Sequence, residues 1–214
     1  ARSIPPTNPL YVQLLQEAAA LPQALWLLYK ATNSTDALLA AADAQWPPAF
    51  AEAAPVVAQT NPEKAIELYR KGADAGNAAC ACVVVRHLVE RRELAAAGEV
   101  LQHFSGTTTD DLRKIAAFVA VIRGRASQAQ YDFLAPYRAA DPEARFFLAA
   151  HELTQGVTAP LEALADAPGT VLFYGPTGRA ACFLLGRAYR QGKGVTRNPA
   201  LAIEWLEKAA ARGW

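Results

Sequence analysis

The residues of this chain that could bind a metal ion are few and scattered. The segment 151–155, HELTQ, begins like the H-E-x-x-H helix of zinc peptidases, but Gln155 stands where the second histidine ligand is required. The other histidines, His87 and His103, lie far away on other predicted helices. We therefore predict no metal site and no cofactor.

Other catalytic motifs also fail. Residues 186–194 superficially resemble a phosphate-binding loop, but five residues instead of four separate Gly186 from Gly192, and Gly194 replaces the Ser or Thr that would hold magnesium. The sequence has no G-x-S-x-G nucleophile motif and no Asp/Asn-rich calcium loop. We predict that the protein has no catalytic residues and is not an enzyme. One alternative stays open, a divergent catalytic site in the irregular segment 167–178.

The three cysteines do not form an obvious disulfide framework. Cys80 and Cys82 are two residues apart on a predicted helix, so their side chains point to opposite sides and cannot join comfortably. Cys182 lies in a distant part of the chain. We interpret all three as buried free thiols, the usual environment of unpaired cysteine. Cysteine usage therefore leaves the compartment undecided.

Charge and hydropathy exclude two classes of partner. The 21 basic and 20 acidic residues give a net charge of +1, which argues against nucleic acid. The most apolar window, residues 20–29, is shorter than the ~18 apolar residues of a membrane span. The chain contains no methionine, and removal of a signal peptide is one interpretation. It leads us to expect a periplasmic or secreted protein, with a cytoplasmic location as the open alternative.

Two segments far apart in the chain share one pattern. Residues 61–76, NPEKAIELYRKGADAG, align with residues 198–213, NPALAIEWLEKAAARG. Their offset of 137 residues is about four units of ~34, the period of a helix–turn–helix solenoid. Both segments start with Asn-Pro and end with Gly, which chance similarity between alanine-rich helices would not produce. The sequence therefore predicts a repeat protein.

Residues 181–213 resemble a Sel1-like repeat, a relative of the tetratricopeptide repeat. The matching residues are Leu185, Gly186, Tyr189, Gly192, Gly194 and Val195 in the first half, and Ala202, Trp205, Ala209, Ala210 and Gly213 in the second. Residues 61–89 resemble the pattern in part, because Leu68 replaces the tryptophan and the G-x-G-V loop is missing. Elsewhere only the helical spacing supports a repeat.

The resemblance implies an all-α fold, a right-handed α-solenoid of about six helix–turn–helix repeats of Sel1/TPR type. We expect divergent helices over residues 1–45 and the repeat array over 46–214. The predicted helices before the C-terminal repeat cover residues 10–20, 22–32, 35–45, 48–59, 62–75, 78–91, 93–104, 110–123, 127–139, 142–155 and 160–166. Since the sequence stops where another first helix should begin, we expect the array to be truncated at its C-terminus.

Two groups of residues are candidate binding sites for a partner. Four arginines fall on predicted first helices, which line the concave side of such superhelices: Arg86, Arg123, Arg187 and Arg190. A basic groove would attract an acidic peptide or an anionic polysaccharide; the alternative is ordinary solvated arginines without a common face. The second group is Leu172, Phe173 and Tyr174, in an apolar loop that could dock a partner or pack against the scaffold.

The function follows from the resemblance alone. Sel1-like proteins act as adaptors, often in bacterial cell envelopes, so we expect a non-catalytic protein–protein interaction scaffold in a bacterial envelope complex. A narrower alternative is a periplasmic scaffold lipoprotein of an exopolysaccharide secretion system of the alginate type. No residue in the sequence distinguishes the two.

Overall fold

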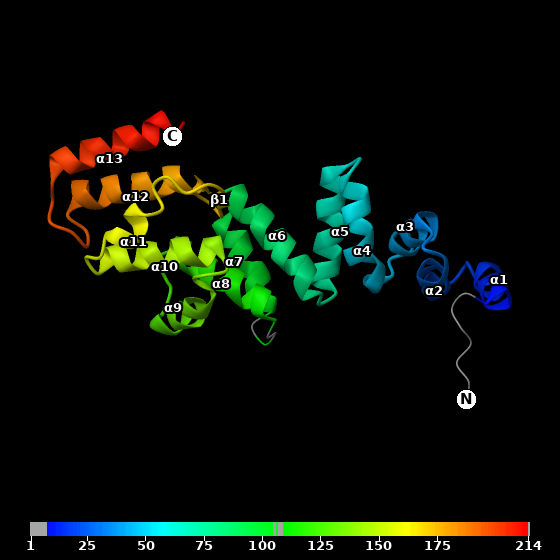
Figure 1. Cartoon of the computed structure of the whole chain (residues 1–214). Helices are drawn as coiled ribbons and strands as arrows, with labels where there is room; N and C mark the ends of the chain where they lie inside the picture. Colours follow the sequence, from blue (N-terminus) through cyan, green and yellow to red (C-terminus); the bar gives the residue numbers. More distant parts are fainter. Residues whose placement is uncertain (1–7, 105, 107–108, 214) are drawn as a thin grey trace. The chain divides into compact units, whose positions relative to one another are not determined.

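The computed structural model describes residues 8–104, 106 and 109–213, and over these residues the chain is almost entirely α-helical (Figure 1). The helices of the N-terminal half are α1 (Pro9–Glu17), α2 (Pro22–Thr32), α3 (Thr35–Asp43), α4 (Pro47–Ala58), α5 (Pro62–Asp74), α6 (Ala78–Glu90) and α7 (Leu94–His103). Those of the C-terminal half are α8 (Asp110–Ile122), α9 (Gln128–Leu134), α10 (Pro142–Thr154), α11 (Ala159–Glu162), α12 (Thr177–Gln191) and α13 (Pro199–Ala211). The predicted all-α repeat fold is confirmed. Trp214, on which the predicted truncation rests, lies outside the described residues.

Three segments differ from the expectations, and one of them is α11, which ends at Glu162 although a helix is expected over residues 160–166. The helix expected over residues 127–139 ends at Leu134 and continues as a 3₁₀-helix, Ala135–Tyr137, because Pro136 has no N–H to donate. The irregular segment 167–178 contains two short strands, β1 (Thr170–Val171) and β2 (Gly175–Pro176). They pair antiparallel, with Val171 opposite Gly175. The segment is therefore a small hairpin.

The chain groups into two compact units. The first comprises Ala1–His87 with Gly98–Leu112, and the second comprises Leu88–Ala97 with Arg113–Trp214. The predicted boundary between residues 45 and 46 falls inside the first unit and stays a prediction. In the described part of the chain, no helix combines the length and apolar character needed to cross a membrane.

The core of the first unit is built largely from small residues. Ala49, Ala53 and Ala54 on α4 are fully buried, and they pack with Phe50 and with Leu68 of α5. Side chains this small let the backbones of neighbouring helices approach closely. In the second unit the core is aromatic instead, with Phe118 and Phe147 stacked at a centroid distance of 4.9 Å. Each unit therefore has its own core.

The two aligned segments begin in the same way. The side chain of Asn61 accepts a hydrogen bond from the N–H of Lys64 (3.0 Å), and that of Asn198 accepts one from Leu201 (3.1 Å). A proline follows each asparagine at the first position of α5 and of α13. Asparagine at the N-cap with proline after it is a strong helix start. The predicted equivalence of these helices is confirmed at this end.

The C-terminal pair α12 and α13 packs closely through Gly186. A Cβ atom on Gly186 would lie 2.7 Å from Cγ of Leu206 and 3.2 Å from the carbonyl oxygen of Ala202. No larger residue fits this position without a shift of α13. Figure 1 shows the two helices side by side. The absence of a side chain at Gly186 therefore allows the close approach of α12 and α13.

Candidate functional site

The hairpin places the predicted loop residues against α10. The backbone N–H of Leu172 donates a hydrogen bond to Oε1 of Glu143 (3.1 Å) on that helix. The Leu172 side chain is only 4% exposed, so it contributes to packing and presents no surface to a partner. Phe173 and Tyr174 remain partly exposed. The partner-binding prediction for this loop therefore now depends on these two rings.

Tyr174 lies on the aromatic core of the second unit. Its ring centroid is 5.6 Å from that of Phe146, 6.4 Å from that of Phe147 and 5.2 Å from that of Phe173. Burial raises the pKa of the Tyr174 hydroxyl, and the positive charges of Arg187 and Arg92 oppose that rise. The phenol is therefore neutral near pH 7, and two guanidinium groups lie close enough to act on it.

Arg92 is a functional candidate that the sequence analysis missed. It lies in the short connection between α6 and α7 with a φ of +66°. Its guanidinium carbon is 4.0 Å from the ring centroid of Phe173, a cation–π distance. Two neighbouring arginines in the three-residue link 91–93 are the only trace in the sequence. Nothing there indicates that one of them meets a ring 81 positions away.

We refer to Arg92, Phe173, Tyr174 and Arg187 as the Tyr174 cluster. It unites members of both predicted groups, since Arg187 was predicted as a groove residue and the two rings as a docking loop. Arg187 is exposed on α12, and its guanidinium carbon is 5.7 Å from the ring centroid of Phe183. All four members of the cluster belong to the second unit.

The structure does not bring all four predicted arginines into one described site. Arg190 is exposed near the end of α12, and Arg123 is exposed just after α8 ends. Arg86 is exposed on α6, in the part of that helix that belongs to the first unit. A common groove for these residues stays a prediction.

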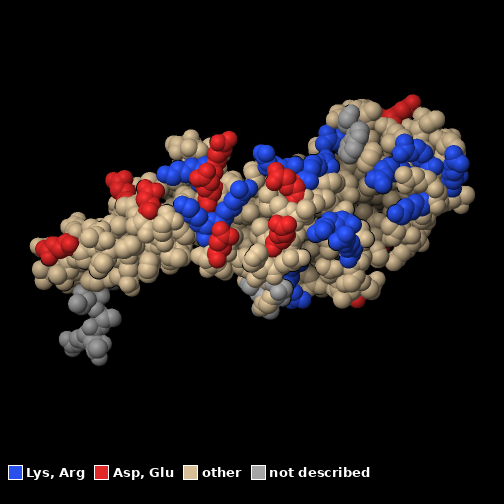
Figure 2. Space-filling model, turned by 180° about the vertical axis from the view of Figure 1, so that it is seen from behind, with Lys and Arg blue, Asp and Glu red and all other residues tan. Residues whose placement is uncertain are grey.

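The charge is distributed unevenly between the units. The second unit has 15 basic and 10 acidic residues, a net charge of +5, and the first unit has 6 and 10, a net charge of −4. Figure 2 shows Lys and Arg spread over the surface of the second unit on that face, with acidic atoms in few places. The overall charge of +1 conceals this contrast. The basic residues of the chain are therefore concentrated in the second unit.

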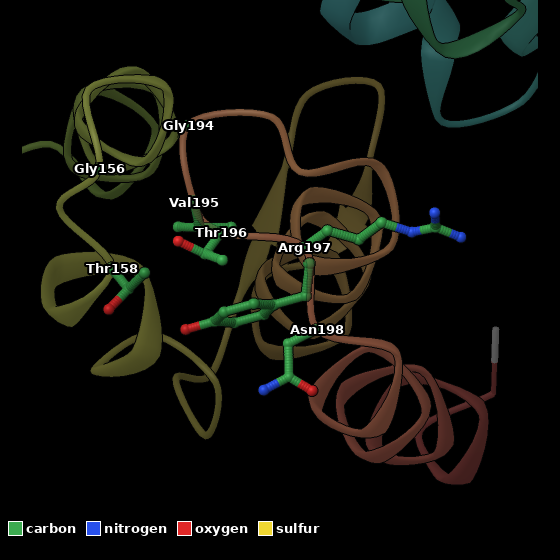
Figure 3. Close-up of a pocket in the computed structure, with 8 residues that line it drawn as sticks. Gly156, Thr158, Gly194, Val195, Thr196, Arg197 and Asn198 are labelled. Carbon is green, nitrogen blue, oxygen red and sulfur yellow. The ribbon is translucent and has the colours of Figure 1, made fainter.

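A second feature of this unit is a cavity of about 490 Å³ that we call the loop hollow (Figure 3). Its lining residues are Gly156, Thr158, Tyr189, Gly194, Val195, Thr196, Arg197 and Asn198. Figure 3 shows Thr158 and Asn198 approaching it from opposite sides, while the side chain of Arg197 extends away. Because Asn198 uses its side-chain oxygen as the helix cap, its NH₂ group is the donor left for the hollow. Hydroxyl and amide groups therefore dominate the lining.

Residues 151–155, which begin like the helix of zinc peptidases, take part in packing. The His151 ring stacks on Tyr131 with centroids 3.6 Å apart, and its Nε2 lies 3.0 Å from Nε2 of Gln155. Within the residues that the structure describes, no three His, Cys, Asp or Glu side chains are grouped to hold a metal ion. None of the three cysteines forms a disulfide; Cys80 and Cys182 are buried, but Cys82 is only partly buried, so the prediction of three buried thiols is wrong for Cys82.

Comparison with known proteins agrees with this architecture. Residues 55–77 and 179–214 match the family model of the Sel1 repeat. A crystal structure of a Sel1 repeat protein from Oxalobacter formigenes aligns with 94% of this chain at 19% identity and a TM-score of 0.47. This chain covers 66% of that protein chain, slightly less than two thirds. No curated protein matches the sequence significantly. Two segments of this chain, residues 55–77 and 179–214, are therefore identified as Sel1 repeats.

Proposed function

We propose that this protein is a non-catalytic scaffold or adaptor in a bacterial envelope complex. Sel1-repeat proteins generally mediate protein–protein interactions and are typically scaffolds. The observation that carries the proposal is that the C-terminal repeat has one set of residues buried between its helices and another set exposed to solvent. Gly186, Ala202 and Ala209 are buried between helices, whereas Arg187 and Arg190 on the same helix pair face solvent. The residues that match the repeat pattern thus build the fold, and the exposed arginines are left to contact a partner.

The partner surface that we propose includes the exposed arginines and the hairpin. Arg123, Arg187 and Arg190 contribute positive charge on the second unit, and Arg86 contributes it on the first. Phe173 and Tyr174 add apolar contact area beside Arg187. The net charge of +5 on the second unit supports an anionic partner, either an acidic peptide or an anionic polysaccharide. In this proposal the protein works in the periplasm or outside the cell.

A second candidate function is scaffolding of an exopolysaccharide secretion system of the alginate type. The loop hollow favours it, because the hydroxyl groups of Thr158, Tyr189 and Thr196 and the amide of Asn198 match the hydrogen-bonding groups of a sugar. Titration with neutral and anionic oligosaccharides, followed by NMR, tests it. Shifts confined to the hollow residues and reduced by Tyr189→Phe would support this function, and an unchanged spectrum would contradict it.

Partner capture tests the scaffold proposal. The protein is cross-linked in its native cells, purified, and its partners are identified by mass spectrometry. We expect a reproducible set of proteins that is lost in the triple variant Arg86→Ala, Arg123→Ala, Arg187→Ala. The matched control is Arg70→Ala, Arg125→Ala, Arg197→Ala, which removes three other exposed arginines. Equal loss in both variants would contradict the proposed surface, and an enzymatic activity abolished by Tyr174→Phe would contradict the non-catalytic function.

A further inference from the structure

We propose that the Tyr174 cluster is a carboxylate-binding site for an Asp or Glu side chain of a partner peptide. This inference rests on the proposed function in one respect, that the partner is a protein. It goes further by naming the chemical group, its position and a contributing residue, Arg92, outside the arginines predicted from the sequence.

The first argument is that the cluster has two cations and no anion. Elsewhere in the second unit, Lys114 pairs with Asp141, Arg138 with Glu152 and Arg212 with Asp166. Among the described residues, no carboxylate lies within ion-pair distance of Arg92 or Arg187. The carboxylate of Glu143, at the base of the hairpin, accepts a hydrogen bond from the Leu172 N–H. A bound anion would supply the missing counter-charge.

The second argument is that the arginine geometry suits a carboxylate. The guanidinium carbon of Arg92 lies 4.0 Å from the ring centroid of Phe173, a cation–π contact. A guanidinium group in such a contact still has N–H donors in its plane that can bind an acceptor. A carboxylate can accept two such parallel hydrogen bonds from one arginine. Stacking also restricts the side chain, so that less conformational entropy is lost on binding.

The third argument concerns the packed aromatic rings of Phe146, Phe147, Phe173 and Tyr174, which we call the aromatic floor of the site. Tyr174 packs on Phe146 and Phe147, and Phe173 packs edge-on against Tyr174. The Phe173 ring contacts the Arg92 guanidinium group, and the Tyr174 ring beside it adds apolar contact area to the site. The neutral hydroxyl of Tyr174 can donate a further hydrogen bond to a carboxylate oxygen.

The aromatic floor favours a peptide over a polysaccharide. Phe173 and Tyr174 are both partly exposed, so an apolar side chain next to the acidic one would bury area against them. A polyuronic acid chain offers carboxylates but no apolar side chain for these rings. Aromatic and arginine residues together are also the residue types enriched at the centres of protein interfaces.

The experiment measures peptide binding by fluorescence anisotropy at low ionic strength. The probe is a short N-acetylated peptide of alternating glutamate and serine with one central phenylalanine. Its control replaces every glutamate by glutamine. We expect Arg92→Gln and Arg187→Gln each to weaken binding of the glutamate peptide at least about 10-fold, because each removes a charged hydrogen-bond partner. The matched control Arg125→Gln should change the Kd less than about twofold.

Titration of the Tyr174 hydroxyl gives a second measurement. If the cluster were merely structural, peptide binding would leave the pKa of Tyr174 unchanged. The Tyr174→Phe variant identifies its signal in ultraviolet difference spectra. Arg187→Gln should raise the pKa of Tyr174, because it removes a positive charge that lowers it. Saturation with the glutamate peptide should raise it as well. Circular dichroism melting curves verify that each variant is folded.

Three results would overturn the inference. These are equal binding of the glutamine peptide, equal effects of Arg125→Gln and Arg187→Gln, and stronger binding of an oligouronate than of the peptide. The scaffold proposal is judged separately by the cross-linked partners. If partners are captured but the cluster variants bind peptide normally, the scaffold function stands and this site does not.

Discussion

A Cβ atom placed on Gly194 would clash with the carbonyl oxygen of Leu153. The loop between α12 and α13 therefore rests directly on the C-terminal end of α10. The same contact brings Gly194 and Gly156 together as neighbours in the wall of the loop hollow. Gly194 also has a φ of +79°, a conformation that costs other residues energy. Both the contact with α10 and the positive φ therefore require glycine at position 194.

Substitution of Gly194 should destabilise the protein more than the cost of placing another residue at a positive φ. We expect Gly194→Ala to lower the free energy of unfolding by about 3 kcal/mol, since the methyl group displaces the loop from α10. Gly124→Ala is the matched control, because Gly124 has a φ of +66° and no atom within 4 Å of its Cβ position. It should cost only about 1 kcal/mol. Equal losses in urea denaturation would show that the α10 contact is unimportant.

Gly186 should be a glycine whose replacement by alanine does not stabilise its helix. Alanine in a helix interior is favoured over glycine by about 1 kcal/mol. Here the new methyl group would meet Leu206, and overpacking costs about 1–3 kcal/mol. We therefore expect a net decrease in the free energy of unfolding for Gly186→Ala.

A double-mutant cycle verifies the cause of that decrease. Leu206→Ala removes the side chain that the new methyl group would contact, so Gly186→Ala should be less harmful in that background. The measurement is urea denaturation of all four proteins. A stabilising Gly186→Ala variant, or an effect independent of Leu206, would contradict the close packing of α12 and α13.

The asparagine caps of the two aligned helices should be equivalent in strength. Asn61→Ala and Asn198→Ala each remove the acceptor for one backbone N–H, so each should cost about 1 kcal/mol of stability. Asn198→Asp keeps an acceptor oxygen and should cost far less. Chemical denaturation measures all three variants. If Asn198→Asp is as harmful as Asn198→Ala, the cap is not the role of this side chain.

Cys80 should resist alkylation. Burial raises its pKa to about 11, and its side chain is 1% exposed. Since the thiolate is the reactive form, its population at pH 8 is about 100-fold lower than for a thiol with the ordinary value of 9.0. In the double variant Cys82→Ala, Cys182→Ala, iodoacetamide should modify Cys80 slowly, and denaturant should accelerate the reaction.

The same shift gives Cys80 a contribution to stability that depends on pH. The raised pKa means that folding favours the neutral thiol. The contribution is fully present below pH 9 and is lost as the pH rises towards 11. Comparison with Cys80→Ala over this range isolates it from tyrosine ionisation. Rapid alkylation of folded protein at pH 8 would contradict the buried neutral state.

Local features of the fold could be predicted from the sequence. The Asn-Pro starts at residues 61 and 198 act within one helical turn, so their effect needs no information from elsewhere in the chain. The mid-helix Gly186 indicated a close helical neighbour because glycine is otherwise unfavourable there. The helix expected over residues 127–139 instead ends at Leu134, because Pro136 has no N–H to donate to an α-helical hydrogen bond.

The Tyr174 cluster depends on tertiary structure. Arg187 and the hairpin rings were both singled out from the sequence, but as separate surfaces, and Leu172 of the same loop is buried. Arg92 approaches Phe173 because the chain folds the α6–α7 link and the hairpin into one unit. Helix caps and helix period are set by neighbours along the chain, and they determined the repeat architecture. Contacts between distant segments depend on how helices of divergent repeats pack, and only the folded chain decided them.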